Sequence, residues 1–133
     1  MAALLLEDAQ VAPKSDAAVI GEQNDIFRRH LGFAAMWKNQ PLTGQILMTP
    51  GITALPEILQ IAIMREVINF RDFNAENDPW GDHGFGVVEV NGTRAFWKID
   101  VLDATGTHGI TVPDAADPSR VFRVLTIYLP SEH

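Results

Sequence analysis

Apolar residues recur every three or four positions in the first third of the chain, a spacing that predicts an amphipathic helix from about residue 15. Ser15 or Asp16 is a suitable N-cap, because its side-chain oxygen can accept a hydrogen bond from an unpaired N–H of the first turn. Gly32 is a natural stop, although residues 33–37 could extend the helix. The apolar stripe of this helix consists of Val19, Ile20, Gln23, Ile26, Phe27, His30 and Leu31.

A second helical pattern begins at Pro56, a residue that suits a first turn because the N–H it lacks would be unpaired there. The wide apolar face that follows predicts the central packing helix of the domain, with Ile61 and Met64 in the core. This face consists of Ile58, Leu59, Ile61, Ala62, Met64, Arg65, Val67 and Ile68.

The clearest local signal is a pair of apolar runs separated by Asn91 and Gly92, the preferred residues of a two-residue type I′ hairpin turn. The cross-strand pairs counted outward from this turn are Val90 with Thr93, Glu89 with Arg94, Val88 with Ala95, and Val87 with Phe96. Strands alternate their faces, and we assign to the core Val88, Val90, Ala95, Trp97, Ile99 and Val101.

Two further β-rich runs, 45–49 and 121–129, predict strands, and the glycine- and proline-containing stretch 104–119 predicts a loop with one helical turn capped at Asp117. The order helix, strand, helix, strand, strand, strand is typical of an α+β fold. We therefore expect a loosely ordered N-terminal lead over 1–14, then a single domain over 15–133. Two helices would pack on a mainly antiparallel sheet of about four strands, with the Asn-Gly hairpin at its centre.

Charge and composition restrict the kinds of site and the classes of partner that the chain can have. Among 133 residues there are 17 acidic and 10 basic side chains, and no cysteine, so disulfides and zinc–thiolate sites are excluded. A net charge of −7 disfavours direct binding to nucleic acid. It could suit a basic protein partner, but the charge alone favours the simpler explanation that it keeps the domain soluble. No signal peptide or membrane span is predicted, and we expect a cytoplasmic protein.

The segment "NDPWGDHGFG" (77–86) holds the densest group of chemically active side chains. Asp78, Asp82 and His83, joined by Asp100 or Asp103, could gather as metal ligands or as a base with an orienting acid. Against a calcium loop, the sixth position is not glycine and the twelfth is not glutamate. The turn-forming residues favour a structural role, so we predict no catalytic residue, metal ion or cofactor, and we expect His83 to hold the loop.

Aromatic side chains suggest a binding role for the same region. Trp80, Phe85 and Phe96 could cluster near the open end of the hairpin, where an aromatic patch ringed by acids would suit a protein partner. The alternative is that these rings cover the core from a second side.

With these motifs in view, the chain resembles the bacterial domain-of-unknown-function family number 3768 over about residues 22–133. The resemblance rests on "MTPGITALP" (48–56), "FNAENDPWGDHGFGVVEVNGTRAFWKIDVLD" (73–103), "PDAADPSR" (113–120) and "RVLTIYL" (123–129). Trp80, Asp82 and Gly84 depart from the family pattern, which weakens a catalytic role for the acids there. The resemblance implies no activity, but it implies small proteins of alphaproteobacteria, often carried on plasmids and other mobile elements.

These observations lead to three hypotheses. The first is a non-enzymatic acidic module of a mobile element that binds a basic, nucleic-acid-binding host complex, in its narrowest form an inhibitor of restriction or CRISPR interference. Its binding residues would be Asp78, Trp80, Asp82, His83, Phe85, Phe96, Asp100 and Asp103. The second is a small metal-assisted hydrolase or nucleic-acid-processing enzyme built on Asp78, Asp82, His83 and Asp100. The third is a homodimer formed through an exposed strand edge.

Overall fold

The structure, a computed structural model, describes residues 15–111 and 114–133, so the predicted N-terminal lead lies outside the described residues. The helices are α2 (Asp16–Arg29), α3 (Pro50–Thr53) and α4 (Glu57–Asn69), with 3-10 turns at η1 (Asp114–Ala116), η2 (Pro118–Arg120) and η3 (Pro130–Glu132). The strands are β1 (Met36–Trp37), β2 (Gln40–Pro41), β3 (Gly44–Met48), β4 (Phe85–Val90), β5 (Thr93–Asp103) and β6 (Val121–Tyr128). The mixture confirms the α+β class.

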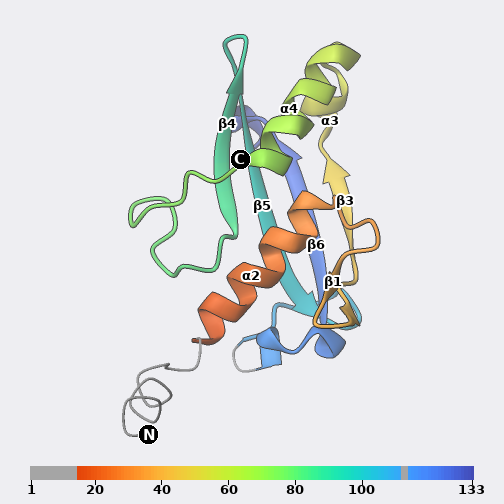
Figure 1. Ribbon diagram of the computed structural model, residues 1–133. Coiled ribbons are helices and arrows are strands. Elements are labelled where there is room, and N and C mark those ends of the chain that lie inside the picture. The colour runs from red at the N-terminus through yellow and green to blue at the C-terminus, as the bar shows by residue number, and fades with distance from the viewer. Residues whose placement is uncertain (1–14, 112–113) are drawn as a thin grey trace, which may run out of the picture.

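The main sheet has the strand order β3-β6-β5-β4 (Figure 1). Strand β5 is antiparallel to both of its neighbours, whereas β3 is parallel to β6. The prediction of a mainly antiparallel sheet is therefore corrected to a mixed sheet. The cause is α4, which carries the chain back along the sheet before β4 begins, so that β3 points the same way as β4 and β6 (Figure 1).

The hairpin formed by β4 and β5 has the predicted turn and register, but the prediction that it lies at the centre of the sheet is wrong, because β4 is an edge strand. Asn91 and Gly92 both have positive φ angles, 50° and 80°, as a type I′ turn requires. The register includes all four predicted pairs and extends them to Gly86 with Trp97 and Phe85 with Lys98. Of the predicted core face, Val88, Ala95, Trp97 and Ile99 are buried, and Val90 and Val101 are partly buried against the core.

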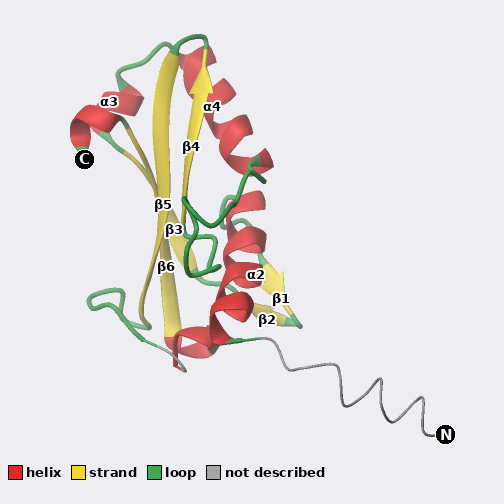
Figure 2. Ribbon diagram, turned by 90° about the vertical axis from the view of Figure 1, so that its left-hand side faces the viewer, coloured by secondary structure: helices red, strands yellow, loops and turns green. Residues whose placement is uncertain are grey.

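Helices α2 and α4 lie on the same face of the sheet, and within residues 15–111 and 114–133 no long helix covers the opposite face (Figure 2). Ser15 is the N-cap of α2, as predicted, and its Oγ accepts a hydrogen bond from the N–H of Ala18 at 3.1 Å. The alternative extension over 33–37 is wrong. Leu31 and Ala34 have φ angles of 49° and 50°, which an α-helix cannot contain, and the chain then enters β1.

The predicted core positions of α4 need correction. Ile63 and Val67 are fully buried, Met64 packs against the core, and Ile61 is 51% exposed. Helix α4 is apolar on most of its circumference, but only one side of it can face the sheet, so a count of apolar positions overstated the buried face. Among the described residues, no helix has the length and apolar character needed to cross a bilayer.

Candidate functional site

The loop that connects α4 to β4, residues 70–84, is fastened to α2 along its second half. The Asn24 side chain donates a hydrogen bond to the backbone oxygen of Asp82 at 2.9 Å. Next to it, the backbone of Gly81 approaches Gly21 so closely that a Cβ at position 21 would lie 2.8 Å from the Gly81 oxygen. A glycine on the helix therefore allows the loop backbone to lie directly on α2.

His83 is the side chain that ties this loop together. Its Nδ1 lies 2.9 Å from Oδ2 of Asp25 on α2, and its Nε2 lies 3.4 Å from Oδ2 of Asp78. Its backbone N–H donates to Oδ1 of Asp78 at 3.1 Å, and its ring stacks on Phe73 with centroids 3.9 Å apart. Both ring nitrogens thus face carboxylates of the protein itself, which agrees with the expectation that His83 holds the loop.

Asp25 also contacts a fully buried guanidinium, that of Arg28. Arg28 donates hydrogen bonds to Oδ1 of Asp25 at 3.1 Å and to the backbone oxygen of Phe70 at 3.0 Å, and its Cζ lies 4.8 Å from the centre of the Trp97 ring. Burial lowers the pKa of Arg28 to about 10, while the charge of Asp25 acts in the opposite direction. Asp25 therefore joins the buried arginine to the loop histidine.

A second buried arginine is connected to the loop through α2. Arg123 on β6 donates to Oδ1 of Asn24 at 2.7 Å and to Oε1 of Gln23 at 2.6 Å, and burial lowers its pKa to about 10. The amide of Gln23 in turn donates to the backbone of Ala116 at 2.9 Å, while Asn24 donates to the loop. The side-chain amides of Gln23 and Asn24 thus connect the buried Arg123 to Ala116 and to the loop 70–84, respectively.

The outer side of the loop is acidic and carries an exposed indole. Trp80 is 79% exposed, and Asp72 and Glu76 on the same loop are also exposed. Burial raises the pKa of Asp82 above its usual value, and the nearby charge of Asp78 raises it further. The loop therefore carries an exposed indole and exposed carboxylates on a backbone that is fastened to α2.

The eight predicted binding residues do not form one group. Asp78, Trp80, Asp82 and His83 lie in the loop 70–84, while Phe85, Phe96 and Asp100 point to the open face of the sheet and Asp103 ends β5. Asp100 forms an ion pair with Lys98 at 3.3 Å. In the part of the chain that the structure describes, no three His, Asp or Glu side chains are placed to share a metal ion. The cluster proposed for a hydrolase is thus divided between two faces.

Asp103 organises a separate loop. Its Oδ1 accepts hydrogen bonds from the hydroxyl of Thr105 at 2.6 Å and from the backbone N–H groups of Thr105 and Thr107. These bonds, the Thr105 hydroxyl first, lower the pKa of Asp103 to about 2. Its contacts account for a structural role in the turn that follows β5.

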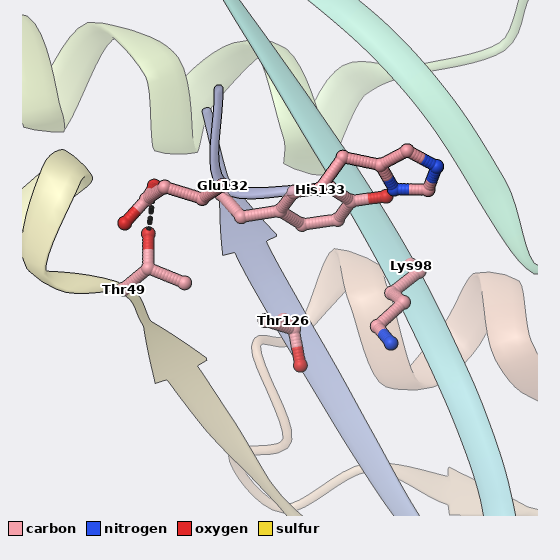
Figure 3. A pocket seen from close by; sticks show the side chains of 6 residues that line it. Thr49, Lys98, Thr126, Glu132 and His133 are labelled. Atoms are coloured by element: carbon pink, nitrogen blue, oxygen red, sulfur yellow. Dashed lines mark hydrogen bonds between the residues drawn. The ribbon is translucent and has the colours of Figure 1, made fainter. Parts of the chain in front are cut away.

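The open face of the sheet carries a ladder of aromatic rings. Phe85 and Phe96 meet edge to face with centroids 5.6 Å apart, and Phe96 meets Tyr128 at 5.5 Å. Trp80 makes no ring contact with them among the described residues, so the expected three-ring cluster is not formed. A hollow of about 220 Å³ lies beside the ladder, lined by Thr49, Lys98, Thr126, Tyr128, Glu132 and His133 (Figure 3).

The carboxylate of Glu132 does not point freely into this hollow (Figure 3). It accepts hydrogen bonds from the Thr49 hydroxyl at 2.6 Å, from the Leu129 N–H at 2.8 Å and from the Gly51 N–H at 2.9 Å. These contacts, that with Thr49 first, lower the pKa of Glu132. Glu132 thus ties η3 to the start of α3.

Several residues that build the loop site were missed by sequence reasoning. The sequence patterns assign no role to Asp25, Arg28 and Arg123, although a partial signal is present: Gln23 falls within an apolar helix stripe and Arg123 within an apolar strand. A polar residue at such a position requires a buried partner. That partner cannot be named before the fold is known.

Comparisons with known proteins identify the family of the chain and no activity. The family described as "Protein of unknown function (DUF3768)" matches residues 48–132. The chain belongs to this family. The matched region begins at the end of β3, so α2 lies outside it and the match is narrower than the resemblance over 22–133. No significant match was found among curated proteins or among solved structures.

Proposed function

We propose that this protein is a non-enzymatic binding module that engages a basic protein surface through the loop 70–84. The observation that carries the proposal is Trp80, which is 79% exposed on a loop whose backbone is fastened to α2. Tryptophan is among the residues that contribute most to protein interfaces.

The fastening of the loop supports a binding role. A partner that meets a flexible loop must order it, and this ordering weakens binding. Here the contacts of His83 with Asp25 and Asp78, and of Asn24 with Asp82, hold the loop before any partner arrives. The loop is therefore suited to present Trp80 at little entropic cost.

Charge supports a basic partner. The net charge of the chain is −7, and Asp72 and Glu76 stand exposed on the loop that carries Trp80. Opposite charges on a partner would speed association and fix its orientation. A nucleic-acid-binding complex of a host defence system is a narrower version of the proposal, and its support is the mobile-element setting that the family resemblance implies.

The alternative, a metal-assisted hydrolase, has weaker support. Its residues Asp78, Asp82, His83 and Asp100 are divided between the loop and the open sheet face. His83 also has a carboxylate of the protein opposite each ring nitrogen, which leaves neither nitrogen directed at a substrate.

The test is a titration of the protein against purified candidate nuclease complexes at two salt concentrations, with Trp80→Ala as the decisive variant. Phe33→Ala is a matched control, because Phe33 is an equally exposed aromatic residue (85%) on a different segment. We expect Trp80→Ala to weaken binding by roughly 30-fold or more and Phe33→Ala to leave it unchanged. Binding that is salt-insensitive, or equally weakened by both variants, would contradict the proposal.

A charge control completes the design. We expect Glu76→Gln on the loop to reduce the association rate and its salt dependence, while Glu66→Gln, an exposed position on α4, has no such effect.

A further inference from the structure

We propose that Arg123 is a positioning residue for the Trp80 loop, which it holds in place through the side chain of Asn24. Arg123 lies on β6 in the interior of the sheet, between β3 and β5, and its side chain is fully buried. Its guanidinium donates hydrogen bonds to Asn24 and Gln23, which are neighbours on α2. Any effect of Arg123 on Trp80 therefore passes through the helix.

The chemistry of the side-chain amides determines how they meet the arginine. An amide has two unlike ends, an oxygen that accepts hydrogen bonds and an NH2 group that donates them. A guanidinium can only donate, so an amide that pairs with Arg123 must present its oxygen. Both amides do so: Nε of Arg123 lies 2.7 Å from Oδ1 of Asn24, and Nη2 lies 2.6 Å from Oε1 of Gln23. Both amides are buried, with exposed fractions of 1% and 0%, so bulk water does not compete for these oxygens.

The orientation that Arg123 imposes determines what each amide holds at its other end. The Asn24 NH2 group donates to the backbone oxygen of Asp82 in the loop at 2.9 Å. The Gln23 NH2 group donates to the backbone oxygen of Ala116 in η1, also at 2.9 Å. If either amide turned over, its oxygen would face a backbone oxygen and its NH2 group would face the guanidinium. Two repulsive contacts would then replace two hydrogen bonds.

The geometry of the guanidinium accounts for an arginine at this position. Taking a charge out of water is costly, and among the described residues the hydrogen-bond partners of the Arg123 side chain are the two neutral amides. Burial lowers its pKa to about 10, so it still carries its charge at neutral pH. What an arginine offers here is a rigid planar set of donors that can hold two neighbouring amides at once.

The consequence for binding rests on the proposed function. Asp82 is two residues from Trp80, so the bond from Asn24 holds the loop backbone close to the indole in the chain. Without the guanidinium the Asn24 amide is free to turn, and a partner must then order the loop as it binds. We expect binding through Trp80 to weaken roughly tenfold in Arg123→Met, although the substituted side chain is buried in the sheet.

Hydrogen exchange of the free protein, followed by NMR, tests the assignment without any partner. The reporters are the backbone N–H groups of Gly81 and His83, which flank Asp82 and donate to Asp78 at 3.1 Å each. We expect Arg123→Met to speed their exchange roughly tenfold relative to the amides of the β4–β5 hairpin. Unchanged relative exchange in this variant would overturn the proposal.

Two controls separate positioning from a general loss of stability. Leu125 is fully buried on the same strand, so Leu125→Ala should lower global stability and leave the loop reporters unchanged relative to the hairpin. Gln23→Leu removes the other amide, so it should speed exchange of the Asp117 N–H, which follows Ala116, and leave the loop reporters unchanged. Loop exchange that rises equally in Leu125→Ala and Arg123→Met would contradict a positioning role.

A double variant tests whether the effect passes through Asn24. We expect Arg123→Met to add nothing to the loop exchange of Asn24→Leu, and an additive increase would overturn the proposal.

If Arg123→Met does not fold, the wild-type chain provides a second measurement. The Asn24 side-chain NH2 protons should exchange slowly and show nuclear Overhauser effects to residues 82–83. Effects to the guanidinium and none to residues 82–83 would mean the opposite amide orientation and would overturn the proposal. Failure of the Trp80 titration would leave these results standing, and their failure would leave that titration intact.

Discussion

The β4–β5 hairpin and the loop 70–84 are neighbours in the sequence, yet different contacts hold them in place. The hairpin is built from residues close in sequence: its turn contains Asn91 and Gly92, and every pair is counted from that turn. The loop depends on α2, whose Asn24 and Asp25 lie 58 positions away from Asp82 and His83. Local patterns therefore specify the first region, and buried polar contacts specify the second.

The difference between the two regions indicates which of them can carry a binding site. The inward side chains of the hairpin are part of the core, so the same apolar contacts stabilise the hairpin and determine its shape. The loop contributes less apolar burial, and its shape depends on hydrogen bonds and charges that solution conditions can alter. A region held in this way can present a binding residue in a defined position.

The largest expected effect comes from the residue that both regions share. Trp97 is fully buried on β5, and its ring meets Phe70, Phe73 and the guanidinium of Arg28. We expect Trp97→Ala to lower the free energy of unfolding by about 3–5 kcal/mol, because it leaves a large cavity. Urea unfolding followed by circular dichroism measures this. The control Trp80→Ala should change stability by less than about 0.5 kcal/mol.

A substitution with a smaller effect on stability should disturb the loop and leave the hairpin unchanged. Asn24→Asp keeps an acceptor for Arg123 but replaces the donor to the Asp82 oxygen with a second acceptor. Because the Asp82 carbonyl is then unpaired, we expect the free energy of unfolding to fall by about 1–3 kcal/mol. Hydrogen exchange should increase in the loop and stay unchanged in the hairpin. Gln23→Glu is the matched control, because its lost donor served Ala116 instead of the loop. Equal loop exchange in both variants would contradict the assignment.

The steric fit between loop and helix can be tested in the same way. Gly21→Ala would place a Cβ 2.8 Å from the Gly81 oxygen, so the loop must move away from α2. We expect the cost to be about 1 kcal/mol, since an exposed loop can shift more easily than a core. By contrast, a Cβ at Gly86 would lie 2.4 Å from Nε1 of the buried Trp97 ring, and Gly86→Ala should cost more. Thermal unfolding of the two variants should show this order.

The pH dependence of stability should carry a signature of Asp82. Its pKa is raised in the folded state, so the folded protein binds its proton more tightly than the unfolded chain does. Stability from this group is therefore present below the usual aspartate range and is lost as the pH rises through the raised value. Asp82→Asn removes the titration, so the unfolding free energy of the variant should increase relative to that of the wild type between about pH 3.5 and pH 6. An unchanged profile in the variant would contradict the raised pKa.

The division between the two regions also explains how far the sequence could be interpreted. Turn residues and alternation were enough to predict the hairpin and its core face, because both are local properties. The direction of β3 and the exposure of Ile61 depend on where α4 lies, which no local pattern specifies. Within the candidate site, His83 was identified as the residue that holds the loop, but its partner Asp25 sits on a helix whose polar positions resemble any solvated face.

The smallest expected effect concerns a contact in the hairpin that looks specific but is exposed. Glu89 and Arg94 face each other across the strands at 3.7 Å, with about three-fifths of each side chain accessible to water. A double-mutant cycle with Glu89→Gln and Arg94→Gln should give a coupling energy of only a few tenths of a kcal/mol, because solvent screens exposed pairs. The register should not change, since the turn and the alternating core face already determine it. If the double variant shifted the cross-strand contacts seen by NMR, charge rather than the local apolar pattern would be fixing the hairpin, and the contrast with the loop would fail.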